Sequence, residues 1–294
     1  MQYAAISLNL DSLGEAYGWP SGYPDPSFFQ IADRFFQIAR KYDFKYSIYV
    51  VGKDLEKPEN RERVRAWARD GHEIGNHSWL HQMDLGAMSR AAIYEDVKHA
   101  HDAIAETTGS APRGFISPAW NTSRTLYTVL SELGYEYDTS IFPSWIMFPV
   151  IAKNLYNHLG NKKFFAILKR KDWLTLAFGT RGVCQKQGVT VLPLPTNRFR
   201  VACWHTLGFM IGWKRHLQLL KSCLREIDAF YYLIHPADLM DRRDLDPGRK
   251  VPLERLGTPL EEKIHHLERA IENILQSGRK IITMSELARR HKII

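Results

Sequence analysis

Short apolar runs alternate along this chain with longer stretches in which apolar residues recur every three or four positions. Seven of the short runs are typical of β-strands: 4–11, 46–52, 73–77, 114–118, 135–140, 189–194 and 230–235. The longer stretches predict helices at 26–42, 58–69, 89–107, 123–133, 213–227 and 259–276. Strands that alternate with helices pair in parallel, and helices cover both of their faces, so such strands are nearly continuous in apolar residues. The pattern therefore predicts an α/β fold, and about seven units favour a (β/α) barrel over an open sheet.

Length and composition predict one domain over residues 1–294. The chain has 294 residues, of which 45% are apolar, and α/β barrels of ~200 to 250 residues commonly form one domain. Its cysteines, Cys184, Cys203 and Cys223, are odd in number and widely spaced, so we expect neither a disulfide framework nor a CxxC metal site. No stretch reads as a secretion signal or as a membrane span. We therefore expect a cytoplasmic location.

Polar residues stand where several of the predicted strands end. Asn9 and Asp11 close the first strand, and His77, Asp138 and His235 close three later ones. The carboxyl ends of barrel strands meet on one face, where active sites are built. One site could collect all of these side chains.

Two histidines four residues apart are the first candidates for metal ligands. The segment GHEIGNHSWLH places His77 and His81 so that both rings could face one divalent ion, and Asp11 could add a carboxylate. Such a pair alone is weak evidence, because histidines at this spacing also occur on surfaces and in cores. The position at a strand end favours the metal site.

Five segments, in order, resemble the motifs of the polysaccharide deacetylases of carbohydrate esterase family 4, the NodB homology group, in its Asp-x-Asp branch. The segments are NLD, GHEIGNHSWLH, GFISPAWNTS, YDTSIFPS and YLIHP. The second is highly specific, and the others are hard to match by chance in this order. The resemblance covers about 4–289, apart from an insertion at 141–188. It implies a distorted (β/α)7-type barrel, with the helical insertion after the fifth strand, and removal of an N-acyl group from an amino sugar.

The same resemblance assigns roles to individual residues. Asp11, His77 and His81 are implied to hold one divalent metal, zinc first, with cobalt, nickel or manganese as alternatives. A metal would polarise the amide and make the attacking water more acidic. His235 is implied to protonate the leaving amine, and the backbone N–H of Ala119 to stabilise the oxyanion.

Three neighbouring residues are candidates for the substrate-binding part of the site. Pro118 precedes the implied oxyanion donor, and Trp120 could stack on a sugar ring or belong to the core. Asp138 could orient charged groups of the site or serve as an ordinary residue at a strand end. For both Trp120 and Asp138 the alternatives remain open.

Two positions depart from the family pattern. Asn9 stands where this branch has the aspartate that takes a proton from water, and Ile116 stands where it has the arginine that pairs with that aspartate. Arg113 is three residues too early to replace that arginine on a regular strand. The chain could be an inactive binding protein, a form whose aspartate was replaced to trap substrate, or an enzyme that activates water with another group.

The insertion at 141–188 holds most of the net charge of +8: eight Lys and Arg residues against one acid, Asp172. Aromatic and aliphatic residues lie between its basic residues, which favours a peripheral contact with anionic membrane lipids. A helical lid over the barrel is the alternative, and nucleic acid is disfavoured because the aromatics are clustered rather than spaced as stacking platforms. The residues expected at the membrane are Trp145, Phe148, Lys162, Lys163, Phe164, Phe165, Lys169, Arg170, Lys171 and Trp173.

Site and insertion together predict a specific substrate. We expect an N-formyl or N-acetyl amino sugar carried on a polyprenyl phosphate, deacylated at the inner face of the cell membrane. A deacetylase of polymeric N-acetylglucosamine glycan is the second hypothesis. A catalytically silent, metal-containing glycolipid-binding protein is the third.

Overall fold

The computed structural model describes residues 2–14, 25–157, 159, 165–245 and 254–292. Its strands are β1 Gln2–Leu10, β2 Ser47–Val50, β3 Glu73–Asn76, β4 Gly114–Phe115, β5 Tyr137–Asp138, β6 Cys184–Lys186, β7 Val189–Val191, β8 Phe230–Ile234 and β9 Arg279–Ile282. Its helices are α1 Gln30–Lys41, α2 Pro58–Arg69, α3 Arg90–Thr108, α4 Arg124–Glu132, α5 Met147–Asn157, α7 Trp173–Phe178, α8 His205–Ile211, α9 Trp213–Glu226, α10 Leu260–Gln276 and α11 Met284–Arg290.

The strands form one curved sheet in the order β6-β7-β5-β4-β3-β2-β1-β8. All neighbours along it are parallel except β6 and β7, which are antiparallel. Among the described strands no pairing joins β8 to β6 or β7, so the sheet curls into a partial barrel without closing. The predicted distorted (β/α) barrel is confirmed in this open form.

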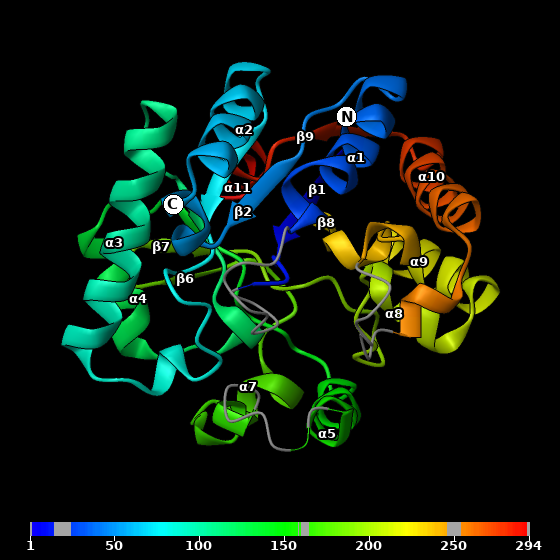
Figure 1. Cartoon of the computed structure of the whole chain (residues 1–294). Helices are drawn as coiled ribbons and strands as arrows, with labels where there is room; N and C mark the ends of the chain where they lie inside the picture. The colour runs from blue at the N-terminus through cyan, green and yellow to red at the C-terminus, as the bar shows by residue number, and fades with distance from the viewer. Residues whose placement is uncertain (1, 15–24, 158, 160–164, 246–253, 293–294) are drawn as a thin grey trace.

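The central strand β1 shows why a nearly continuous run of apolar residues predicted a strand. Every residue from Ala4 to Leu10 is buried, because neighbouring elements cover both faces of the strand. Helices α2 to α4 pack outside the sheet on one side of the molecule and α9 and α10 on the other, and α1 lies between α2 and α10 (Figure 1). Helix ends follow local signals: the Ser89 side chain caps α3 at its start, and Gly109 ends it with φ 77°.

The last strand, β9, was not predicted. It pairs with Gln2–Ala5 of β1, on the same side as β2, which pairs further along with Ser7–Leu10. The buried Arg279 guanidinium stabilises this junction by donating to the carbonyls of Tyr3, Leu224, Ile227 and Asp228. A four-residue run that contains Arg and Lys carries no clear strand pattern, so only its pairing with β1 reveals it.

Tyrosine side chains fill the concave side of the sheet. The Tyr49 hydroxyl donates to the Tyr137 hydroxyl at 2.9 Å, and Tyr137 donates to Glu73 Oε1 at 2.9 Å. Gly75 and Gly114 make room for these rings: a Cβ at Gly114 would lie 2.0 Å from the Tyr137 ring, and one at Gly75 would lie 2.5 Å from the Tyr49 ring. The interior is therefore filled below the ends of the strands.

The insertion leaves the barrel directly after β5, as predicted, and returns through β6. Its described part contains α5 and α7, joined in sequence through the short 3₁₀ turn Ala166–Lys169. In Figure 1, α5 and α7 lie together at the lower end of the molecule, apart from the helices around the sheet. None of the described helices is long and apolar enough to cross a bilayer.

Candidate functional site

Asp11 and the two histidines predicted as metal ligands meet just beyond the ends of β1 and β3. Asp11 Oδ1 lies 3.1 Å from His77 Nε2 and 3.6 Å from His81 Nε2. One potential ligand atom from each of the three residues falls within 4.8 Å of the others. The parallel pairing of β1, β2 and β3 brings the two chain segments together, as the predicted barrel requires.

The loop that carries His81 is held in an uncommon backbone conformation. Ser78 has φ 65° and His81 has φ 51°, in the left-handed region that non-glycine residues rarely adopt. Asn76 Oδ1 accepts from Ser78 N at 2.7 Å, and Asp96 of α3 accepts from the next two backbone amides, at 2.9 and 3.2 Å. Strained residues persist only where such contacts over-determine them, and they concentrate at functional sites.

The hydrogen bond on the far side of the His77 ring fixes which of its nitrogens faces Asp11. His77 Nδ1 lies 2.7 Å from the Ile116 carbonyl oxygen, so it carries the proton and donates there. Nε2 then presents its lone pair toward Asp11. A carboxylate and two imidazoles are a donor set suited to zinc and related ions.

His235 lies across the Asp11 carboxylate from the other two histidines. Its Nε2 is 4.0 Å from Asp11 Oδ2, whereas His77 and His81 approach Oδ1. Burial lowers the pKa of His235, and the carboxylates of Asp11 and Asp238 oppose that shift. The ring therefore lies beside the three candidate metal ligands without joining them, and its role as a proton donor stays a prediction.

Asp238 supports His235, and sequence reasoning missed it. Asp238 Oδ2 accepts from His235 N at 2.8 Å and lies 4.0 Å from His235 Nδ1. Arg255 and Thr206 both donate to Asp238 Oδ1, at 2.8 and 3.2 Å. Burial would raise the pKa of Asp238, but Arg255 and the nearby histidines lower it below its usual value. The sequence HPAD could have indicated Asp238, because an acid three residues after His235 can form a capping box with it, as it does here.

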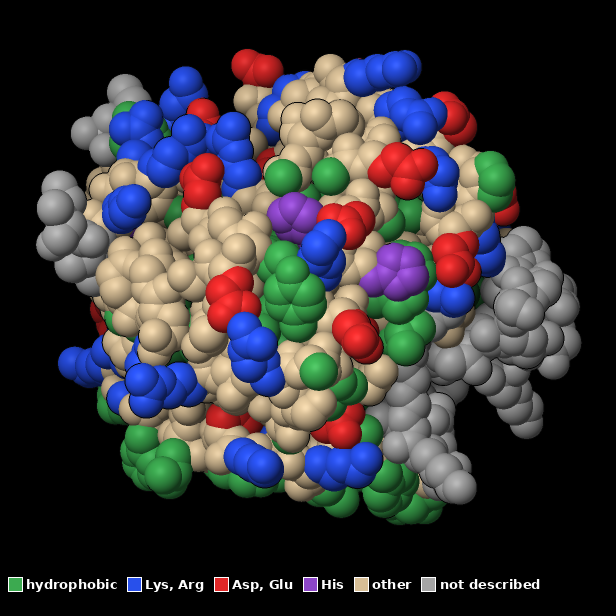
Figure 2. Space-filling view, turned by 90° about the vertical axis from the view of Figure 1, so that its left-hand side faces the viewer, with side chains coloured by type: hydrophobic (Ala, Val, Ile, Leu, Met, Phe, Trp, Pro, Cys, Tyr) green, Lys and Arg blue, Asp and Glu red, His purple; other side chains and the backbone are tan. Residues whose placement is uncertain are grey.

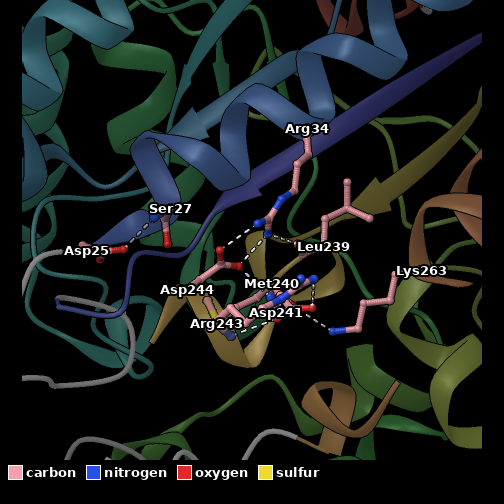
Figure 3. A network of polar contacts seen from close by, with 9 residues as sticks. All are labelled: Asp25, Ser27, Arg34, Leu239, Met240, Asp241, Arg243, Asp244 and Lys263. Atoms are coloured by element: carbon pink, nitrogen blue, oxygen red, sulfur yellow. Dashed lines mark hydrogen bonds and ion pairs between the residues drawn. The ribbon is translucent and has the colours of Figure 1, made fainter. Parts of the chain in front are cut away.

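The segment that follows His235 is tied to the barrel by two basic side chains (Figure 3). Arg34 of α1 donates to the Leu239 carbonyl at 2.7 Å and to both carboxylate oxygens of Asp244. The buried Lys263 of α10 donates to the Met240 carbonyl at 2.6 Å, and burial lowers its pKa to about 8. These contacts fix the chain beyond β8 and hence the direction in which His235 leaves the strand.

The loop after β4 carries the implied oxyanion donor. Ala119 has φ 50° and ψ 23°, and Trp120 has φ 51°, so two consecutive non-glycine residues are left-handed. Pro118 is buried, as are His77, His81 and His235, and its role toward substrate stays a prediction. Trp120 is half-buried, with its ring edge-on to Phe142 at 4.9 Å, and its role toward a sugar stays a prediction.

Asp138 does not line the site, which corrects its assignment as a substrate contact. It is fully buried, and the Tyr127 hydroxyl of α4 donates to it at 3.1 Å. Ser140 donates to both its oxygens and in turn accepts from Ser117 N at 2.7 Å. The carboxylate therefore supports the loop after β4 from behind. Burial raises the pKa of Asp138 to about 6 despite the hydrogen bonds from Ser140 and Tyr127.

The two departures from the family pattern are both buried. Asn9 is 3% exposed, and its Oδ1 accepts no hydrogen bond within the described part of the chain. Ile116 is completely buried, and Arg113 lies at the other end of β4, partly exposed and 3.6 Å from Glu136. Arg113 therefore does not take the place of the missing arginine.

The insertion exposes its apolar side chains. Of the ten large hydrophobic residues exposed in the described chain, eight fall within 141–188: Trp145, Phe148, Tyr156, Leu159, Phe165, Leu168, Leu174 and Phe178. Lys169 and Lys171 are exposed beside them, and Trp173 is half-buried against Phe148. Figure 2 shows hydrophobic and basic side chains together along the lower edge, at the level of α5 and α7 in Figure 1.

One of the residues expected at the membrane is placed elsewhere. Arg170 is 2% exposed, because its guanidinium pairs with Asp172 and with backbone carbonyls of the loop after β4. A buried, fully paired guanidinium cannot meet lipid headgroups. Lys162, Lys163 and Phe164, also expected at the membrane, lie outside the described residues.

Comparison with known proteins supports the resemblance seen in the motifs. Residues 23–137 match the sequence model of the polysaccharide deacetylase family, a range that includes His77, His81 and the loop after β4. A peptidoglycan deacetylase of Helicobacter pylori is 26% identical over 108 residues, 37% of this chain and 36% of that protein. A chitin deacetylase of Colletotrichum lindemuthianum is 26% identical over 117 residues, 38% of this chain and 47% of that protein. The matches thus span between a third and a half of these relatives.

Solved structures share the fold over nearly the whole chain. A structure described as a polysaccharide deacetylase from Mycobacterium smegmatis superimposes with a TM-score of 0.61 at 14% identity, covering 99% of this chain and 90% of that one. A CE4 family pseudoenzyme from Bacillus anthracis superimposes with a TM-score of 0.53 at 14% identity, covering 98% and 65%. A mutant of that pseudoenzyme is described as having restored enzymatic activity.

Proposed function

Because this chain carries the polysaccharide deacetylase homology region on the matching fold, we propose that it is built to hydrolyse the N-acyl amide of an amino sugar, releasing the amine and a carboxylic acid. The observation that carries this proposal is the meeting of Asp11, His77 and His81, with His235 on the other side of the Asp11 carboxylate. Three metal-type donors beside one separate proton donor suit metal-assisted amide hydrolysis.

Asp11, His77 and His81 would hold the divalent metal, and the donor set fits such an ion. When bound, the metal would supply Lewis-acid polarisation of the amide carbonyl and a more acidic attacking water. His235 would deliver a proton from Nε2 to the nitrogen of the leaving amine. Asp238 would hold His235 in place by accepting a hydrogen bond from the His235 backbone N–H. The Ala119 N–H would stabilise negative charge on the former carbonyl oxygen.

The proton from the attacking water has no obvious acceptor at Asn9, because a neutral amide does not accept a proton at ordinary pH. The orphaned, buried Oδ1 of Asn9 marks a place where a carboxylate would fit by size. We propose that the site belongs to an active enzyme type whose base is altered in this chain, and that a carboxylate at this position activates it. Activation of water by another group, or binding without turnover, is the competing interpretation.

The substrate we propose is an N-formyl or N-acetyl amino sugar carried on a polyprenyl phosphate at the inner face of the cell membrane. The exposed apolar residues of the insertion, with Lys169 and Lys171 among them, suit a surface that dips into anionic lipid. The insertion also contacts the active-site loop through Arg170, so a docked insertion would hold the site close to the lipid surface.

A polymeric N-acetylglucosamine glycan is the second candidate substrate. It is favoured by the names of two relatives, a peptidoglycan deacetylase and a chitin deacetylase. A third candidate, a silent glycolipid-binding protein, is favoured by Asn9.

Amine release by an Asn9→Asp variant tests the proposed function. The variant, loaded with zinc, is offered formylated and acetylated amino sugars on polyprenyl phosphate, chitin oligosaccharides and peptidoglycan fragments, and new amines are measured by fluorescence labelling. We expect release from the lipid-linked substrates, with the parent chain and an Asn9→Asp/His235→Ala variant at least a hundredfold slower, because acid–base groups typically contribute that much. Release from polymers alone would favour the second candidate. No release from any substrate would contradict hydrolysis and favour a binding protein.

A further inference from the structure

The insertion sends two charged side chains inward. Arg170 and Asp172 form a buried pair with both guanidinium–carboxylate contacts made: Nε to Oδ1 at 2.8 Å and Nη2 to Oδ2 at 3.0 Å. The Arg170 side chain is 0% exposed and that of Asp172 is 9% exposed. Removing one partner of such a pair leaves an uncompensated buried charge, so the pair acts as a unit.

This pair forms five hydrogen bonds with the loop after β4. Arg170 Nη1 donates to the Ala119 carbonyl at 3.1 Å, and Nη2 donates to the Trp120 carbonyl at 2.9 Å. Asp172 accepts from Asn121 Nδ2 at 3.0 Å, and from Thr122 N and Oγ1 at 2.7 and 3.0 Å. Four consecutive residues of the loop are thus bonded to two residues of the insertion.

The loop needs such support because of its backbone. Ala119 and Trp120 both have φ near 50°, and a non-glycine residue held in the left-handed region costs roughly 1 kcal/mol or more. Ser140 holds the start of the loop at Ser117 N, so the Arg170–Asp172 pair supplies the contacts at its other end. The two carbonyls that Arg170 binds belong to the peptide planes directly after the Ala119 N–H.

We propose that Arg170 and Asp172 are positioning residues for the oxyanion donor: they hold the Ala119–Trp120 turn so that the Ala119 N–H faces the reacting carbonyl. This inference rests on the proposed function, because it gives that N–H a task in amide hydrolysis. It makes the insertion part of the active site as well as the source of the exposed apolar surface. Arg170 and Asp172 then connect the exposed apolar surface of the insertion to the turn that carries the oxyanion donor, so binding of a partner at that surface would also act on this turn.

Arg170→Lys tests the proposal, since lysine keeps the charge but loses the planar fork that reaches two carbonyls and a carboxylate. Arg181→Lys is the matched control: Arg181 lies in the same insertion but donates to Thr196 and Glu226, away from the loop. Two measurements are made. Hydrogen exchange of the backbone amides within 117–122, which are those of all its residues except Pro118, is followed in the parent background, and kcat and KM for amine release are determined in the Asn9→Asp background.

We expect Arg170→Lys to speed exchange at 117–122 about tenfold or more and to lower kcat about ten- to a hundredfold, with KM within about twofold, because a displaced donor costs transition-state rather than ground-state binding. Arg181→Lys should change neither. A double variant, Arg170→Met/Asp172→Asn, removes both charges and should reproduce the loss of kcat without leaving an unpaired carboxylate. Unchanged exchange at 117–122, or equal loss of kcat in the Arg170 and Arg181 variants, would overturn the proposal.

The catalytic role of the Ala119 N–H and the support of its loop by Arg170 and Asp172 are tested separately. If Asn9→Asp releases no amine from any substrate, hydrolysis is contradicted and the catalytic part of this inference falls with it. The exchange experiment still decides whether the Arg170–Asp172 pair holds the loop.

Discussion

The side of the sheet that a residue faces decides whether its side chain reaches this site. Asp11, at the end of β1, points to His77 and His81, and Asn9 lies two residues earlier with an unsatisfied buried oxygen. Asp138 also stands at the end of a strand, yet its carboxylate turns toward Tyr127 of α4. Residues that look equivalent in the sequence thus take different tasks, because neighbouring positions on a strand face opposite sides.

The buried Asp138 predicts a specific dependence of stability on pH. Its pKa is about 6 in the folded chain against an ordinary 3.8, so between these pH values the folded state keeps a proton that the unfolded state has released. Stability contributed by this group is therefore full below pH ~4 and is lost as pH rises toward 6, by roughly 2–4 kcal/mol. In Asp138→Asn this loss should vanish.

Urea unfolding of both proteins at pH 4.5, 5.5 and 7 measures this difference. We expect the free energy of unfolding of the parent to fall more steeply across the series than that of Asp138→Asn. Parallel curves for the two proteins would show that Asp138 is not the group that titrates.

At the scale of elements, the insertion combines a buried and an exposed contact. Arg170 and Asp172 bind the loop after β4, while α7 exposes Leu174 and Phe178, at 77% and 75%. One short segment thus faces the active-site loop and the outside of the molecule. An element with exposed apolar side chains and nearby lysines is suited to a lipid surface.

Flotation with lipid vesicles checks this surface. We expect the parent chain to float with vesicles rich in phosphatidylglycerol, less with phosphatidylcholine, and less at high salt, because screening weakens attraction between lysines and headgroups. Leu174→Ser/Phe178→Ser should weaken binding at least tenfold, since burying one such side chain contributes about 1.5–3 kcal/mol. Met210→Ser, an exposed apolar residue of α8 outside the insertion, is the control. Equal flotation of all three proteins, or no dependence on lipid or salt, would leave the insertion as a lid.

At the scale of the whole molecule, the three proposed metal donors connect segments that are far apart in sequence. Asp11 follows β1 and the histidines follow β3, so a bound ion would link the two strands in the folded state only. A ligand that binds only the folded state stabilises it by mass action, about 2.7 kcal/mol at a concentration one hundred times its Kd.

Thermal unfolding with and without zinc measures this link. We expect zinc to raise the unfolding temperature by several degrees, a chelator to reverse the shift, and elemental analysis to find about one divalent ion per chain. His77→Ala/His81→Ala should lose both effects, while His265→Ala, an exposed histidine on α10, should keep them. A zinc shift that persists in the double variant would place the ion elsewhere.

The strands and site residues that could be predicted from the sequence are those that depend on contacts between residues close together in the chain. Alternating apolar runs are local, and they placed seven of the nine described strands and the meeting of Asp11, His77 and His235 at the strand ends. The strand β9 depends on a partner at the other end of the chain, and Asp238 depends on Arg255 and Thr206. No spacing rule reports such partners, because they meet only after the chain has folded.

The sequence by itself determined the α/β architecture, and it singled out Asp11, His77 and His81 as candidate metal donors and Asn9 as unusual, because each rests on local pattern or on the identity of a side chain. Only the tertiary structure decided which charges are buried. Arg170 looked like one more basic residue of a basic segment, and folding pairs it with Asp172 and two backbone carbonyls. The cost of burying an unpaired charge favours this arrangement. Asp172 is only two residues away, but the carbonyls of Ala119 and Trp120 and the loop amides that complete the site lie about fifty residues away.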